Sequence, residues 1–196
     1  MKIAITGGIG SGKSVVLEIC RQLGYSTFSC DEIYKEIVNT DEYIQKIQQV
    51  FPSVVENGKI DRASLANIIF RDKKARKDLN EIAHPLIMSV LLREMNACQG
   101  VCFAEVPLLF EGNFVNLFDS IIVVQRNRLA RKLAIQQRNG LSDVEAEERI
   151  KVQFDYDDLK NQEYLRQINA YVLENEGGIA LLSEKISLLL HQIQAS

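Results

Sequence analysis

Short apolar segments alternate along the chain with amphipathic ones. Five short segments are strand candidates: 1–6, 25–29, 101–106, 120–125 and 171–173. The first is apolar and β-branched, which suits a strand buried on both faces of a parallel sheet. Apolar residues at helical spacing predict helices at 14–23 and 179–193, and two charged helices are expected at 128–139 and 142–154. Strands that alternate with helices need crossover connections, so the pattern predicts a three-layer α/β fold around a parallel sheet.

Two stretches depart from this alternation. Residues 31–99 are helical and more polar, with landmarks at Phe51-Pro52, Asn57-Gly58 and His84-Pro85, and they are too long for a loop. Residues 128–168 are charged and helical, as a lid would be. We therefore expect a core of 1–30, 100–127 and 169–196, an inserted helical domain of 31–99 and a lid of 128–168.

Composition narrows the classes of function. The 196 residues carry 23 Lys and Arg against 26 Asp and Glu, so the basic surplus of a general nucleic-acid binder is missing. No apolar run approaches the roughly 20 residues of a membrane span, and the amino terminus has no secretory apolar stretch. The four cysteines, with two histidines, show no zinc-site spacing. We expect a cytoplasmic protein with buried thiols that binds neither nucleic acid nor membrane.

One motif carries clear chemistry. Residues 7–14 (GGIGSGKS) match G-x-x-x-x-G-K-[ST] between a predicted strand and a predicted helix. Glycines allow backbone N–H groups to turn toward a phosphate, and the helix terminus adds further donors. Lys13 would reach the β- and γ-phosphates, and the Ser14 hydroxyl would ligate Mg²⁺. The motif predicts a nucleotide-phosphate site.

The chain lacks the signatures of two large classes of phosphate-loop protein. Neither N/T-K-x-D nor D-x-x-G, which a GTPase switch needs, occurs in the sequence, and neither does the L-S-G-G-Q of transporter ATPases. A short chain with helical insertions suits a small-molecule kinase, whose lid excludes water from the phosphates.

Two carboxylates lie at the carboxyl ends of predicted strands, where ligands bind in open α/β sheets. Asp31 would orient or deprotonate the acceptor hydroxyl; its other interpretation is an N-cap of the next helix. Glu105 would hold a water bound to Mg²⁺; its other interpretation is a carboxylate paired locally.

Basic residues gather in two places. Arg128, Arg131 and Arg138 share one side of a predicted helix; we favour Arg138 for stabilising the transferring phosphoryl group, against a solvated lid helix. Residues 71–77 (RDKKARK) are interpreted as a solvated helix face, with contact to a phosphate-bearing substrate as the alternative.

The sequence resembles one family, dephospho-CoA kinase, over nearly its whole length. The matching segments are 6–14 (TGGIGSGKS), 57–62 (NGKIDR) with Leu65, Leu79 with 82–85 (IAHP), 106–111 (VPLLFE), 118–119 (FD) before 121–124, Arg138 with 140–142 (GLS), 149–150 (RI) with Gln153, and 172–173 (VL) with Asn175.

The resemblance implies an α/β, three-layer phosphate-loop kinase fold with a parallel sheet, an inserted helical CoA-binding domain and a helical lid. It implies transfer of the γ-phosphoryl of ATP to the ribose 3′-hydroxyl of dephospho-CoA with Mg²⁺, in a monomer or a homo-oligomer. The implied residues are, for catalysis, Lys13, Asp31 and Arg138; for ATP, Gly8, Gly10, Ser11, Gly12, Lys13, Ser14 and Val15; for substrate, Asp31, Arg62 and His84; for the metal, Ser14 and Glu105.

Three positions depart from the family pattern. Ser29 stands where the family commonly has the first Asp of Asp-x-Asp, so the work of that carboxylate would pass to Glu105. Val15 replaces a frequent Thr, and Asn169-Ala170 replaces an Ala-Asp pair. Another small-molecule kinase and a non-catalytic nucleotide-binding module remain the competing hypotheses.

Overall fold

The chain is divided into two compact units. The structure, a computed structural model, describes residues 1–195. One unit comprises Met1–Phe28 and the chain from Cys98 onward, and the other comprises Ser29–Ala97. The second unit overlaps most of residues 31–99, the predicted inserted domain, and residues 128–168, the predicted lid, belong to the first unit.

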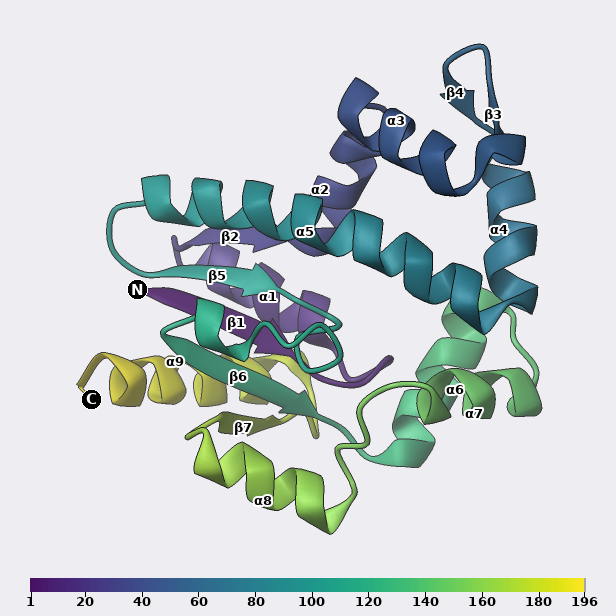
Figure 1. The fold of residues 1–196 in the computed structure, drawn as a ribbon. Helices are drawn as coiled ribbons and strands as arrows, with labels where there is room; N and C mark the ends of the chain where they lie inside the picture. Colours follow the sequence, from purple (N-terminus) through teal and green to yellow (C-terminus); the bar gives the residue numbers. More distant parts are fainter. Residues whose placement is uncertain (196) are drawn as a thin grey trace. The chain divides into compact units, whose positions relative to one another are not determined.

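A five-stranded sheet forms the centre of the first unit (Figure 1). Its order is β2-β5-β1-β6-β7, and β1 pairs in parallel with β5 and β6, as β6 does with β7. All five predicted segments form these strands: β1 Lys2–Thr6, β2 Ser26–Ser29, β5 Cys102–Glu105, β6 Ser120–Gln125 and β7 Tyr171–Glu174. The predicted parallel α/β sheet is confirmed.

Two helices cover one face of this sheet with apolar side chains. Helix α1 spans Lys13–Gln22 and helix α9 spans Ile179–Ala195. Successive side chains of a strand point to opposite faces, so Ile3 and Ile5 of β1 reach the same cluster of buried residues. Ile186 of α9 is fully buried in that cluster. This packing fixes β1 and α1 on either side of the glycine-rich loop.

The lid segment contains three helices. They are α6 Arg128–Asn139, α7 Asp143–Lys151 and α8 Leu159–Gln167. Gly140 ends α6 in the left-handed region (φ 64°), and Ser142 with Glu145 forms a capping box that starts α7. Helix α7 ends at Lys151, three residues before the end of the predicted helix 142–154. Helix α8 has no counterpart among the predicted helices.

The second unit is helical, with α2, α3 and α4 in contact with α5. Its elements are α2 Cys30–Ile37, α3 Asp41–Val50, the 3₁₀ helix η1 Pro52–Val54, β3 Val55–Glu56, β4 Lys59–Ile60, α4 Arg62–Arg71 and α5 Lys73–Ala97. Asn57 and Gly58, both at positive φ, turn β3 into β4, as predicted. Helix α5 continues through Pro85, because packing against three helices outweighs the lost hydrogen bond.

A second 3₁₀ helix, η2 Val115–Leu117, precedes β6 in the first unit. No helix within residues 1–195 has both the length and the apolar content that crossing a membrane requires.

Candidate active site

The glycine-rich loop of residues 7–12 joins β1 to α1. Gly7, Gly10 and Gly12 have φ of 143°, 78° and 98°, which side chains rarely permit. Gly12 is the N-cap of α1 and contributes no side-chain cap to the helix. The first turn of α1 therefore presents its backbone to the loop without a capping side chain, as an anion site at a helix terminus requires.

The carbonyl groups at the start of the loop accept hydrogen bonds from within the motif. Lys13 Nζ donates to Gly7 O at 2.9 Å and to Gly8 O at 3.3 Å. The Ser11 N–H also donates to Gly8 O, at 3.1 Å. At the other end, Gly12 O accepts from the N–H groups of Val15 and Val16. The Val15 N–H is thus used inside α1.

Side chains from distant parts of the chain hold the remaining loop carbonyls. Arg131 Nε of α6 donates to Ile9 O at 3.1 Å, and Arg126 Nη1 donates to Gly10 O at 3.4 Å. Asn175 Nδ2 donates to Ser11 O at 2.7 Å. Every carbonyl from Gly7 to Gly12 consequently has a hydrogen-bond donor.

This anchoring orients the N–H groups of the loop. A peptide plane places its C=O and N–H on opposite sides, so a held carbonyl directs the next N–H away from its donor. The N–H of Ile9 donates to Gln153 Oε1 at 2.6 Å. Within the described part of the chain, no acceptor is found for the N–H groups of Gly8, Gly10 and Gly12. These three donors are available to a phosphate.

Arg131 is a buried cation placed against the loop. Its side chain is 4% exposed, and burial lowers the pKa of its guanidinium. No carboxylate among residues 1–195 forms an ion pair with it. A Cβ on Gly8 would lie 2.2 Å from Arg131 Nη2, so glycine is needed there for the guanidinium to approach. A buried cation without an ion pair is costly, and it becomes favourable when an anion binds beside it.

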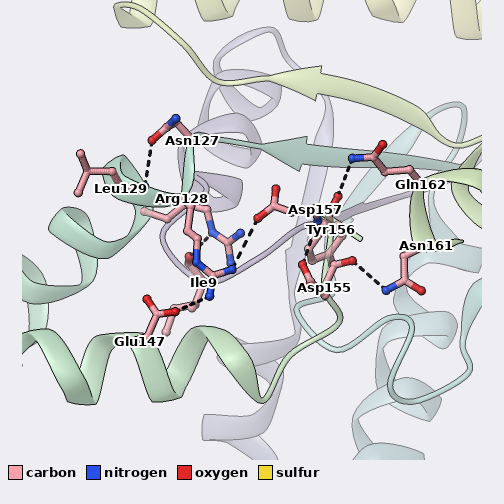
Figure 2. A network of polar contacts seen from close by, with 11 residues as sticks. Ile9, Asn127, Arg128, Leu129, Glu147, Asp155, Tyr156, Asp157, Asn161 and Gln162 are labelled. Carbon is pink, nitrogen blue, oxygen red and sulfur yellow. Dashed lines mark hydrogen bonds and ion pairs between the residues drawn. The ribbon is translucent and has the colours of Figure 1, made fainter. Parts of the chain in front are cut away.

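The other two arginines of α6 are arranged differently. Arg128 pairs with Glu147 of α7 and with Asp157, as Figure 2 shows. The distance from Arg128 Nη1 to Asp157 Oδ2 is 3.8 Å. The hydrogen bond with Glu147 raises the pKa of Arg128 and lowers that of Glu147. Arg138 is exposed and donates to Asn139. Of the three predicted cations, the structure brings Arg131 to the loop, whereas we had favoured Arg138.

The segment that ends the lid is anchored beside the same loop. Tyr156 is buried, which raises the pKa of its hydroxyl, and that hydroxyl lies 3.4 Å from Thr6 Oγ1 at the end of β1. Phe110 contacts the rings of Phe154, Tyr156 and Tyr164. Glu111 accepts a hydrogen bond from the Phe154 N–H at 2.8 Å. The 106–111 block thus holds the end of the lid in place.

Ser14 and Glu105 meet, as their predicted joint role requires. Ser14 Oγ donates to Glu105 Oε1 at 3.2 Å, and Glu105, at the end of β5, is 7% exposed. Two such hard oxygens suit Mg²⁺, which usually takes one or two protein ligands together with phosphate and water oxygens. No group of three His, Cys, Asp or Glu residues that could hold a metal occurs within 1–195.

The second unit holds the predicted substrate residues. Asp31 lies in the first turn of α2 and is exposed; the N-cap of that helix is Ser29, so the capping interpretation of Asp31 is wrong. Arg62 donates to Asn39 Oδ1 at 3.0 Å and borders a cavity of about 160 Å³ among Tyr34, Leu65 and Leu79. His84 is half-buried in α5.

The basic run 71–77 spans the end of α4 at Arg71, the break at Asp72 and the first turns of α5. Lys77 pairs with Glu81 on α5, and Arg76 donates to the carbonyls of Ile69 and Phe70. Six of its seven residues are exposed or half-buried. These contacts favour the interpretation as a solvated helix face.

Several residues of the site had no assigned role. Arg126, Gln153, Tyr156 and Asn175 contact the loop or the end of β1 from positions more than 110 residues away in sequence. Gln153 and Asn175 belong to segments that match the family, and that match was the one sequence feature that could have pointed to them. Their contacts with the loop arise only in the folded chain, so local sequence patterns do not predict them.

Comparison with known proteins agrees with this geometry. The family model described as dephospho-CoA kinase matches residues 1–180. A dephospho-CoA kinase of Geobacillus kaustophilus is 34% identical over 161 residues, covering 79% of this chain and 80% of that protein.

Two solved structures are also similar to this chain. A structure from Thermus thermophilus described as TT1252 has a TM-score of 0.78 and 30% identity, and covers 100% of this chain and 96% of its own. A dephospho-CoA kinase from Campylobacter jejuni has a TM-score of 0.61 and 25% identity, covering 98% and 96%. The fold, the phosphate loop and the family match lead to one conclusion: this chain belongs to the dephospho-CoA kinase family.

Proposed function

We propose that the chain transfers the γ-phosphoryl group of ATP to the ribose 3′-hydroxyl of dephospho-CoA, giving CoA and ADP. Family membership supports the reaction. The observation that carries the phosphate site is the pair of buried cations, Lys13 and Arg131, at a loop whose N–H groups at Gly8, Gly10 and Gly12 are available. Such donors stabilise charge on phosphoryl oxygens without reorganising during the reaction.

The loop and its lysine bind the β- and γ-phosphates. Lys13 exchanges its bonds to Gly7 O and Gly8 O for phosphate oxygens when the nucleotide enters. Ser14 and Glu105 hold Mg²⁺ directly or through water. When bound, Mg²⁺ neutralises charge on the phosphate oxygens.

The lid supplies a cation to the transferring group. Arg131 is the arginine of α6 that already lies on the loop, and its guanidinium turns from Ile9 O to phosphoryl oxygens. Arg138, our prediction from sequence, would need to approach from an exposed position. We therefore assign the principal role to Arg131.

The helical unit receives dephospho-CoA. Asp31, in the first turn of α2, takes the proton of the ribose hydroxyl; no described residue pairs with its carboxylate. Arg62 and the cavity that it borders bind part of the substrate. His84, in α5 of the same unit, is also assigned to substrate binding.

The substrate assignment is tested by measuring ADP release with Mg²⁺ and ATP across dephospho-CoA, nucleosides and nucleoside monophosphates. We expect kcat/KM for dephospho-CoA to exceed every other acceptor by more than about 100-fold, because polar groups built for one substrate reject others. Preference for another acceptor refutes the assignment. Binding of ATP and dephospho-CoA without turnover would indicate a non-catalytic module.

The role of Asp31 is tested by Asp31→Asn, with Asp41→Asn as the matched control in the first turn of α3. Loss of a general base lowers kcat by about 10²- to 10⁴-fold. We expect that loss for Asp31→Asn with the KM for ATP little changed, and near-normal turnover for Asp41→Asn. Activity of Asp31→Asn within a few-fold of the unaltered protein would contradict the assignment.

The two lid arginines are compared by Arg131→Ala and Arg138→Ala in steady-state kinetics. Removing a cation that stabilises the transferring group costs about 10²-fold or more in kcat. We expect a loss of that size for Arg131→Ala and a loss below about tenfold for Arg138→Ala, with thermal unfolding showing that both variants fold. The reverse order would return the role to Arg138.

A further inference from the structure

Asn175 connects the last strand of the sheet to the phosphate loop. It directly follows β7, and its own N–H donates to Gln125 O at 2.8 Å, which continues the pairing of β6 with β7. Its backbone is therefore fixed by the sheet. Its side chain crosses from this strand end to Ser11 O, 164 residues earlier in the chain.

The contact between Asn175 and the loop is close. At 2.7 Å, it is the shortest of the side-chain hydrogen bonds to the carbonyls of residues 7–12. Ser11 O can only accept, so the amide nitrogen must face it. A Cβ on Gly12 would lie 2.2 Å from Asn175 Nδ2, so the amide fills the space beside that glycine.

The held carbonyl fixes a donor on the other side of its peptide. Ser11 C=O and the Gly12 N–H belong to one planar group and point in opposite directions. With Ser11 O bound to Asn175, the Gly12 N–H points away from Asn175, and no described residue accepts it. Gly12 immediately precedes Lys13, whose ammonium serves the same phosphates in the proposed function.

We propose that Asn175 is a positioning residue of the nucleotide site, which holds the Ser11–Gly12 peptide so that the Gly12 N–H donates to a phosphate oxygen. This inference rests on the proposed function for its ligand, ATP, and extends it to a residue outside the motif. Asn175 acts through the loop, and its effect is on phosphate binding rather than on recognition of the base.

The test measures binding of Mg²⁺-ATP and of Mg²⁺-tripolyphosphate, which has no base, to the full chain and to Asn175→Ala by calorimetry. One lost hydrogen bond changes an equilibrium by roughly two- to tenfold. We expect Asn175→Ala to bind both ligands about five- to tenfold more weakly, by the same factor, while its affinity for dephospho-CoA stays within twofold.

Asn161→Ala is the matched control, because Asn161 Nδ2 also donates to a backbone carbonyl, that of Asp155 at 2.8 Å. Its affinity for both phosphate ligands should stay within twofold. The same control shows what loss of an amide-to-carbonyl bond does to thermal unfolding.

Four results would overturn the inference, three of them with Asn175→Ala and one with the unaltered chain. Weaker binding of ATP with normal binding of tripolyphosphate would show that Asn175 reads the base. Normal binding of both would show that the hydrogen bond does not set the loop. Weaker binding of ATP, tripolyphosphate and dephospho-CoA alike, with a lower unfolding temperature, would show a general structural role. If the unaltered chain bound neither ATP nor tripolyphosphate, the proposed nucleotide site itself would fail, and the inference with it.

Discussion

The site depends on hydrogen bonding to the carbonyl groups of residues 7–12. Glycines let this backbone turn, but conformational freedom alone would leave many orientations open. Lys13, Arg131, Arg126 and Asn175 all donate to these carbonyls, and the planar peptide turns the N–H groups of Gly8, Gly10 and Gly12 away from Lys13, Arg131 and Asn175 respectively. These oriented N–H groups and cations create a local positive potential in a protein of net charge −3. Binding of a phosphate chain at this loop therefore needs oriented backbone dipoles and a few cations, without an overall excess of basic residues.

The same contacts tie the lid to the nucleotide site. Arg131 and Gln153, at either end of the lid helices α6 and α7, both bond to Ile9, and Ile9 packs on the apolar cluster of those helices. Tyr156 and the Phe110 cluster hold the segment that follows. Arg131 and Gln153 thereby connect these two helices to the loop at Ile9.

Much of this could be predicted from sequence, for identifiable reasons. The five strands were located as short segments between helical ones; Ser14 in α1 and Glu105 at the end of β5, both assigned to Mg²⁺ from sequence, do form a hydrogen bond. Helical spacing grouped Arg128, Arg131 and Arg138 but could not say which turn of α6 meets the loop; Arg131 makes that contact, whereas Arg138 is the arginine favoured from sequence. Asn175 and Gln153 each bond through one side-chain amide to a loop residue more than 140 positions away in the sequence. Single contacts of this kind leave no periodic pattern in the sequence. Helix α5 passes Pro85 because tertiary packing overrides local preference.

If these carbonyl contacts set the loop in place, they do so before a nucleotide binds. Backbone ¹⁵N relaxation in the protein without nucleotide compares the amides of Gly8, Gly10 and Gly12 with those of β1. We expect order parameters of about 0.85 for the loop, equal to those of the strand. Values below about 0.6 that rise when ATP is added would contradict it, since the phosphate would then be organising the loop.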